Sequence, residues 1–178
     1  RMAELLGKAA ALFVPSGTMA NLLAIMSQTH HGETIILCAD AHPYKYEGGN
    51  LASVGGLMTR TLKGELGVLT ADEICPYISR STDPHYSTTT LIAIENTTNI
   101  GGGNLYKLDT IAAIRRLASD NGMNVHCDGA RLFNAVVAAG ISAADFVRDV
   151  DTVSVCFSKG LGAPVGSIVA GPTDTIAR

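Results

Sequence analysis

The stretch TVSVCFSKGLGAPVGS occupies residues 152–167 and places an apolar run directly before a lysine and a glycine-rich turn. The run 152–157 has no polar face, which predicts a strand buried on both sides. Lys159 then stands at the exit of that strand, where we expect its stem to be enclosed and its amine to point into a cleft. A desolvated lysine amine loses its proton more easily and attacks carbonyl groups, so this position suits a Schiff-base lysine. A lysine that is simply solvated at a strand end is the alternative.

The composition predicts one domain with a large core. The chain has 178 residues, of which 47% are hydrophobic and 16% charged. Its net charge of -3 gives no electrostatic reason to bind nucleic acid or an anionic membrane, and no apolar run reaches the length of a membrane span. The four cysteines are widely spaced and three lie in apolar runs, which predicts buried free thiols and a reducing, cytoplasmic compartment.

Apolar strand patterns alternate with helical patterns along the chain. We predict buried strands over residues 34–39, 89–95, 124–128, 152–157 and 167–170, and helices over residues 2–12, 18–28, 108–121 and 131–139. The turn-rich segment 44–49 and the Thr-rich segment 79–90 are predicted connections. This alternation predicts a three-layer α/β fold with a mostly parallel sheet.

A turn of small residues, PSGTMAN at residues 15–21, leads into one of the predicted helices. Ser16 or Thr18 can cap this helix, while Gly17 lets a ligand approach the backbone. Free N–H groups and the helix dipole then form an anion site suited to a phosphate. An ordinary helix cap without a ligand is the alternative.

The segment VHCDGAR at residues 125–131 ends a predicted buried strand on an aspartate. A carboxylate there is costly to bury without a partner. The N–H of a protonated heteroaromatic ring would satisfy Asp128, and so would a structural pair with Arg131. Arg131 could instead reach a ring oxygen of the same ligand.

Asp128 and Lys159 are separated by one helical crossover, the length of a right-handed βαβ unit. Ligands of such folds gather at the carboxyl ends of the strands, so we expect both side chains at one edge of the sheet. An acid at one end of a flat ring and a lysine at the other is the arrangement that pyridoxal 5'-phosphate chemistry needs. The sequence therefore predicts a site for this cofactor and no metal site.

Six segments resemble, in order and spacing, the low-specificity L-threonine aldolases, which are fold-type-I, pyridoxal-phosphate-dependent enzymes. They are residues 15–21, Ala41-His42, Glu47-Gly48-Gly49, Glu95-Asn96-Thr97, residues 126–131 (HCDGAR) and residues 158–166 (SKGLGAPVG). The resemblance implies retro-aldol cleavage of a small β-hydroxy-α-amino acid, L-threonine or L-allo-threonine, to glycine and acetaldehyde through an external aldimine.

The same resemblance implies a domain organisation. Residues 1–178 would be the cofactor-binding large domain, an internal fragment truncated at both ends, with the C-terminal small domain absent. The whole protein would be a homodimer or homotetramer. The fragment by itself would hold most of the cofactor shell but could be inactive.

The resemblance also implies a role for each matched site residue. Lys159 would form the imine with the cofactor, Asp128 would pair with the pyridine nitrogen, and Arg131 would contact the 3-oxygen of the ring. His42 would stack on the ring near the substrate hydroxyl, where it could accept the hydroxyl proton because imidazoles titrate near neutral pH. The phosphate would be held by Ser16, Gly17 and Thr18.

Several histidine assignments stay open. A bound water could replace His42 as the base, or His42 could only pack. Many relatives carry a histidine where this chain has Thr98, which leaves the preference between threonine and allo-threonine undetermined. His126 shares the strand face of Asp128 and could line the site or lie buried behind it. The remaining histidines are predicted at the surface: His30, His31 and His85.

Three other classes of protein compete with an aldolase. A β-eliminating amino-acid lyase of the same fold would use the same lysine and aspartate with another substrate pocket. A non-catalytic or truncated relative is disfavoured by the intact set of cofactor residues. A nucleotide-binding α/β domain is the least favoured, because the chain has neither a Gly-x-Gly-x-x-Gly turn after an early strand nor a P-loop lysine.

Overall fold

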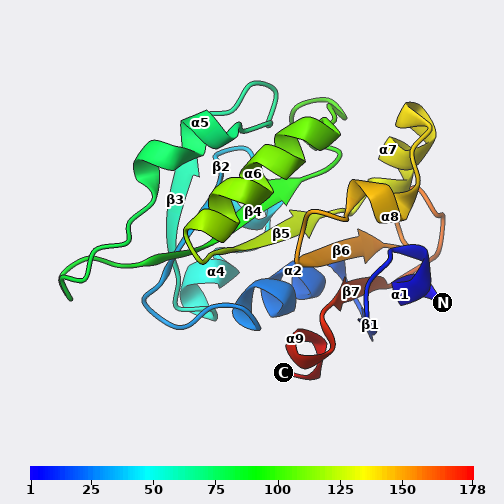
Figure 1. Cartoon of the computed structure of the whole chain (residues 1–178). Helices are drawn as coiled ribbons and strands as arrows, with labels where there is room; N and C mark the ends of the chain where they lie inside the picture. The colour runs from blue at the N-terminus through cyan, green and yellow to red at the C-terminus, as the bar shows by residue number, and fades with distance from the viewer.

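The computed structural model describes residues 1–178 and contains a seven-stranded mixed sheet between layers of helices (Figure 1). The sheet runs in the order β1-β7-β6-β5-β4-β2-β3, and only β7 is antiparallel to its neighbours. The strands are β1 (Ala10–Val14), β2 (Thr34–Cys38), β3 (Met58–Leu62), β4 (Thr89–Glu95), β5 (Asn124–Asp128), β6 (Thr152–Cys156) and β7 (Ser167–Gly171). The predicted three-layer, mostly parallel α/β fold is confirmed.

Helices cover both faces of the sheet. Helix α2 (Gly17–Met26) contacts β6 and β7, whereas α6 (Leu108–Asp120) contacts β5 from the opposite side (Figure 1). All residues of β2, β6 and β7 are buried, as their unbroken apolar runs predict. The buried side of α6 carries Ile111, Ile114 and Ala118, one face at helical spacing.

The other helices are short, and most lie in connections. They are α1 (Met2–Leu5), α3 (His42–Lys45), α4 (Asn50–Ser53), α5 (Ala71–Ile74), the 3-10 helix η1 (Cys75–Tyr77), α7 (Leu132–Ala139), α8 (Ala143–Phe146) and α9 (Thr173–Ala177). The predicted helices over 18–28, 108–121 and 131–139 are confirmed as α2, α6 and α7. None of the helices combines the length and the hydropathy that a membrane span requires.

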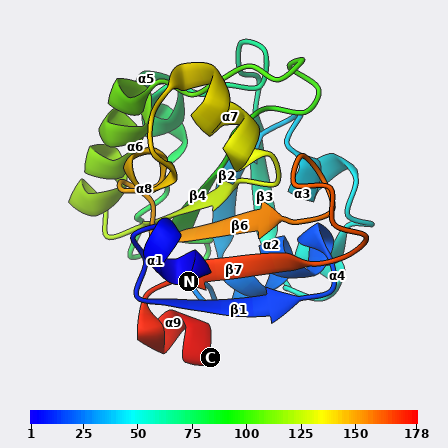
Figure 2. The ribbon, with the colours of Figure 1, turned by 90° about the vertical axis from the view of Figure 1, so that its right-hand side faces the viewer.

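The predicted helix over residues 2–12 is wrong beyond its first turn. Helix α1 ends at Leu5, Gly7 adopts a left-handed φ of 61°, and the chain then enters β1. Strand β1 pairs antiparallel with β7 at one edge of the sheet, and Figure 2 shows β6, β7 and β1 side by side. The partner of β1 lies more than 150 residues further along the chain, so local periodicity could not reveal it.

The other edge strand, β3, was not predicted either. Its residues alternate between exposed and half-buried up to Leu62, and polar residues interrupt its apolar pattern. The two predicted connections are confirmed. Gly48 and Gly49, with φ of 66° and 68°, link α3 to α4, and residues 79–88 are irregular before β4 begins. The prediction of buried free thiols is also confirmed, because all four cysteines are free and three are buried.

Candidate active site

A cavity of about 430 Å³ opens where β4, β5 and β6 end, beside the start of α2. Sites for small ligands commonly span roughly 300–1,000 Å³, so this cavity is large enough for a cofactor or an amino acid. Parallel strands bring their carboxyl ends to one edge of the sheet, and the polar residues that follow them meet there. All seven residues that the sequence singled out line this cavity: Ser16, Gly17, Thr18, His42, Asp128, Arg131 and Lys159.

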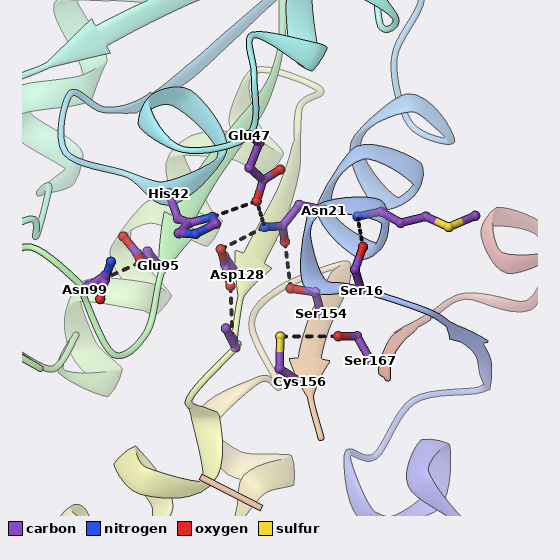
Figure 3. Close-up of polar contacts among 12 residues, drawn as sticks. Ser16, Asn21, His42, Glu47, Glu95, Asn99, Asp128, Ser154, Cys156 and Ser167 are labelled. Carbon is purple, nitrogen blue, oxygen red and sulfur yellow. Dashed lines mark hydrogen bonds and ion pairs between the residues drawn. The ribbon is translucent and has the colours of Figure 1, made fainter. Parts of the chain in front are cut away.

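Asp128 is the last residue of β5 and is buried, with 3% of its surface exposed. Its Oδ2 accepts a hydrogen bond from Asn21 Nδ2 at 2.8 Å, and its Oδ1 accepts from the backbone N–H of Ala130 at 3.0 Å (Figure 3). These two donors stabilise the ionised carboxylate and fix its orientation. Each oxygen keeps a lone pair, so Asp128 can accept one further N–H from the cavity.

The structure does not contain the Asp128–Arg131 pair that was one sequence-based alternative. Arg131 precedes α7, and its Nη1 donates to the side-chain oxygen of Asn99 at 3.2 Å. The guanidinium therefore lines the cavity as a separate donor, while the amide of Asn21 satisfies Asp128.

Asn21 links the polar residues of the site, and the sequence analysis did not single it out. It lies on the buried face of α2 with 2% of its surface exposed. Its Nδ2 donates to Asp128 Oδ2 and Glu47 Oε1, both at 2.8 Å, while its Oδ1 accepts from Ser154 Oγ at 2.7 Å (Figure 3). Carboxylates only accept, so the amide nitrogen must face them. No local pattern in the sequence marks this residue, because its partners lie on other elements.

His126 lies behind the site, as one of the two alternatives for it predicted, and is fully buried. Its Nε2 is 3.2 Å from Asn21 Oδ1, and its Nδ1 is 2.9 Å from Thr152 Oγ1. Because Asn21 Oδ1 is an acceptor, Nε2 carries the ring proton and the Thr152 hydroxyl donates to Nδ1. Burial lowers the pKa of His126 to about 4, so the ring is neutral near pH 7. The predicted surface positions of three histidines are confirmed: His30, His31 and His85.

His42 opens α3, and its ring lies at the cavity in contact with a buried carboxylate. Its Nδ1 is 2.8 Å from Oε1 of Glu47, which is buried and whose pKa is raised by desolvation. His42, Glu47 and Asp128 place ligand-type atoms within 4.8 Å of one another. The amide hydrogens of Asn21 engage one oxygen of each carboxylate, while Glu47 Oε2 is buried without a hydrogen-bond partner.

Glu95 ends β4, pairs in register with Asp128 and lines the same cavity. Its Oε1 accepts from the backbone N–H of Asn99 at 3.2 Å. Burial, together with the negative charge of Asp128, raises the pKa of Glu95 to about 7. Thr98 is buried, donates to the carbonyl of Leu66 at 2.9 Å and is absent from the cavity lining.

The start of α2 presents free backbone donors to the cavity. Ser16 is the cap, because its Oγ accepts from the N–H of Met19 at 3.2 Å. The N–H groups of Gly17 and Thr18 have no partner within the chain, which makes this helix end an anion site. A Cβ at Gly17 would lie 2.7 Å from Cys156 Sγ, so the glycine lets α2 approach β6 closely.

Lys159 is at the cavity but is exposed, so the prediction that its stem is enclosed is wrong. Strand β6 ends at Cys156, and Lys159 falls three residues later in a turn that carries it to the mouth of the cavity. Its amine forms no hydrogen bond or ion pair within the chain. Strands β5 and β6 are parallel neighbours with Asp128 opposite Ser154, which confirms that Asp128 and Lys159 lie at one edge of the sheet.

Sequence similarity over the whole chain shows the family to which it belongs. A family model described as Beta-eliminating lyase matches residues 1–178, and the chain belongs to this family. The fold is that of threonine aldolase from Leishmania major, which superposes with a TM-score of 0.87 at 24% identity over 98% of this chain and 51% of that one.

Sequence comparison gives the more particular likeness. The chain is 46% identical to an uncharacterized protein of Caenorhabditis elegans, over 100% of this chain and 43% of that protein. It is 40% identical to low-specificity L-threonine aldolase 1 of Arabidopsis thaliana, over 99% of this chain and 50% of that enzyme. The Escherichia coli low specificity L-threonine aldolase is 37% identical, over 99% of this chain and 52% of that enzyme. The chain thus spans about half the length of these relatives, and its resemblance to low-specificity threonine aldolases is confirmed.

The donor set of the cavity fits pyridoxal phosphate. The free N–H groups of Gly17 and Thr18 suit a phosphate, and the buried, doubly hydrogen-bonded Asp128 suits a pyridinium N–H. The unpaired amine of Lys159 suits an aldehyde. The cavity therefore offers matching residues for three chemically different groups of this cofactor.

Proposed function

We propose that the protein is a pyridoxal-phosphate-dependent lyase that cleaves L-threonine and L-allo-threonine to glycine and acetaldehyde. The observation that carries this proposal is the placement of Asp128 and Lys159 after neighbouring parallel strands, on one cavity with the free N–H groups of α2. The likeness to low-specificity threonine aldolases supports the choice of substrate.

Each site residue has a distinct task in this proposal. Lys159 would hold the cofactor covalently through its amine, and Asp128 would accept the ring N–H. Arg131 would donate to the ring oxygen, and His42 would stack on the ring. The helix start would bind the phosphate through Ser16, Gly17 and Thr18.

Cleavage requires a proton acceptor for the β-hydroxyl of the substrate and a place for the electrons of the breaking Cα–Cβ bond. Pyridoxal phosphate, when bound, supplies a cationic conjugated ring that takes up this electron pair. His42 Nε2 would accept the hydroxyl proton, so that the hydroxyl oxygen becomes the carbonyl oxygen of acetaldehyde. Asp128, oriented by hydrogen bonds from Asn21 and Ala130, would accept the N–H of the protonated ring nitrogen.

A second candidate follows from the family itself. The matching family model is described as Beta-eliminating lyase, and a β-elimination would use the same lysine and aspartate. An aldolase releases acetaldehyde and glycine, whereas an eliminating lyase releases ammonia and a keto acid. Assay of both product pairs with the full-length protein separates the two reactions.

The proposal is tested by trapping the lysine. We expect the full-length protein with pyridoxal phosphate to show a visible absorption band that borohydride removes, and peptide mapping to locate the reduced adduct on Lys159. The variant Lys159→Ala should lose the band and at least about 100-fold of the aldol cleavage rate, while Lys63→Ala, at an exposed site, should keep both. An adduct on another lysine, or full cleavage by Lys159→Ala, contradicts the proposal.

The assembly and compartment are proposals of the same kind. The resemblance implies a cytoplasmic homodimer or homotetramer acting on a small amino acid. Sedimentation of the full-length protein with bound cofactor tests the oligomeric state, and the distribution of the tagged full-length protein in cells tests the compartment.

A further inference from the structure

The carboxylate beside His42 lies on the side of the ring away from solvent. The Glu47 side chain has no exposed surface, whereas 28% of the His42 side chain is exposed. Glu47 Oε1 is 2.8 Å from His42 Nδ1, and no other side chain forms a hydrogen bond with either ring nitrogen. The two ring nitrogens of His42 therefore differ, because Nδ1 has a buried hydrogen-bond partner and Nε2 has none.

Chemistry decides which nitrogen carries the proton. Asn21 Nδ2 donates to the same Glu47 Oε1 at 2.8 Å, so this oxygen is already an acceptor (Figure 3). A carboxylate oxygen has no hydrogen to donate, so the hydrogen bond between Glu47 Oε1 and His42 Nδ1 requires the proton to reside on Nδ1.

We propose that Glu47 is a positioning residue that keeps the His42 proton on Nδ1 and thereby leaves Nε2 as a proton acceptor at the cavity. This inference rests on the proposed function, in which His42 faces the substrate hydroxyl. A carboxylate that selects one tautomer of a histidine also fixes the rotation of its ring. Without this acceptor, the ring can place an N–H at the cavity, which is a donor and cannot take the hydroxyl proton.

Asn21 completes the arrangement. Its second amide hydrogen goes to Asp128 Oδ2, and its oxygen is held by Ser154 and His126. The position of Glu47 is thereby tied to the carboxylate proposed for the ring nitrogen. A single amide therefore holds both Asp128, assigned to the cofactor, and Glu47, the partner of His42.

The tautomer of His42 can be measured directly. Solid-state ¹⁵N spectra of the full-length protein, labelled on histidine and loaded with pyridoxal phosphate, distinguish protonated from bare ring nitrogens. The signals of His42 are assigned by difference with His42→Asn. We expect a protonated Nδ1 and a bare Nε2 at neutral pH.

Two substitutions of Glu47 separate the effect of its hydrogen-bond acceptor from the effect of its side-chain volume. Glu47→Gln keeps an oxygen that can accept from both Asn21 and His42, so it should retain the Nδ1–H form and most of the activity. Glu47→Leu removes the acceptor, and it should give a mixture of tautomers and lower kcat/KM by about tenfold or more. If Glu47→Leu fails to fold, the wild-type and Glu47→Gln spectra still decide the assignment.

The chain offers a matched control in a second carboxylate–imidazole pair. Asp83 Oδ1 is 2.6 Å from His85 Nδ1, and both side chains are exposed. Asp83→Leu should change only the His85 signals and leave activity unchanged. A bare Nδ1 in wild-type His42, or an unchanged tautomer in folded Glu47→Leu, overturns the inference. An Nδ1–H tautomer in a protein without aldol cleavage would refute the proposed function and leave the positioning by Glu47 intact.

Discussion

At the scale of single residues, the site depends on a chain of buried hydrogen bonds in which each residue donates to the next, ending at Asp128. Gln28 Nε2 donates to Thr152 Oγ1 at 2.7 Å, and the Thr152 hydroxyl donates to His126 Nδ1. His126 Nε2 in turn donates to Asn21, whose amide hydrogens reach Asp128. Every donor in this series points toward the carboxylate, so its negative charge is stabilised without a buried cation.

His126 should make the stability of the protein depend on pH. Its pKa is lowered by burial from 6.5 to about 4, so as the pH falls the unfolded chain binds this proton before the folded one. The stability contributed by the neutral ring is complete above pH 6.5 and is lost as the pH falls toward 4. The loss amounts to about 3 kcal/mol, since one pKa unit corresponds to about 1.4 kcal/mol.

Urea unfolding of the wild type and His126→Gln at a series of pH values measures this contribution. The glutamine can donate to Asn21 but does not titrate, so its unfolding free energy should fall less steeply with acidification. His85→Gln, at an exposed histidine, should follow the wild type. Parallel curves for the wild type and His126→Gln would show that the buried ring does not titrate as we infer.

At the scale of elements, the site depends on how closely α2 approaches β6. Gly17 at the start of the helix faces Cys156 at the end of the strand, and Asn21 one turn later faces Ser154 two residues earlier. The contact with the strand therefore sets both the position of the free N–H groups and the position of the amide that holds Asp128. Phosphate binding and carboxylate orientation are coupled through one helix.

A methyl group at Gly17 should disturb this contact. The new Cβ would lie 2.7 Å from Cys156 Sγ, so Gly17→Ala should lower the free energy of unfolding by about 1–3 kcal/mol. In a Cys156→Ala background the clash is absent, and the same substitution should cost much less. A double-mutant cycle by urea unfolding measures the coupling, and additive effects of the two changes would contradict a direct clash.

At the scale of the whole molecule, long-range pairing builds the β1 edge of the sheet. Strand β1 joins β7 beside both ends of the chain (Figure 2). The segment before β1 is tied down by Lys8, whose Nζ donates to the carbonyls of Val147 and Val150 near α8. This amine is partly buried, and its burial lowers the pKa of Lys8.

Removing the Lys8 amine should loosen this edge of the molecule. Lys8→Met keeps most of the apolar stem but leaves two carbonyls without their donor, which should cost about 2 kcal/mol. Limited proteolysis should then cleave within residues 1–9 sooner than in the wild type. Lys63→Met, at an exposed lysine, should leave both the unfolding midpoint and the cleavage rate unchanged. Equal protection of both variants would show that the Lys8 contacts do not hold the segment.

The sequence by itself determined the central strands, the three longest helices and seven of the residues that line the cavity. Buried parallel strands are continuous apolar runs, and polar residues directly after them have to meet at one edge, so Asp128 and Lys159 could be placed together from order alone. Only the tertiary structure decided the edge strands β1 and β3, because an edge strand is defined by a partner distant in the chain. Asn21 and Glu47 were missed for the same reason. Their importance comes from hydrogen bonds between side chains on different elements, which no local pattern records, and the exposure of Lys159 likewise depends on where its turn leaves the sheet.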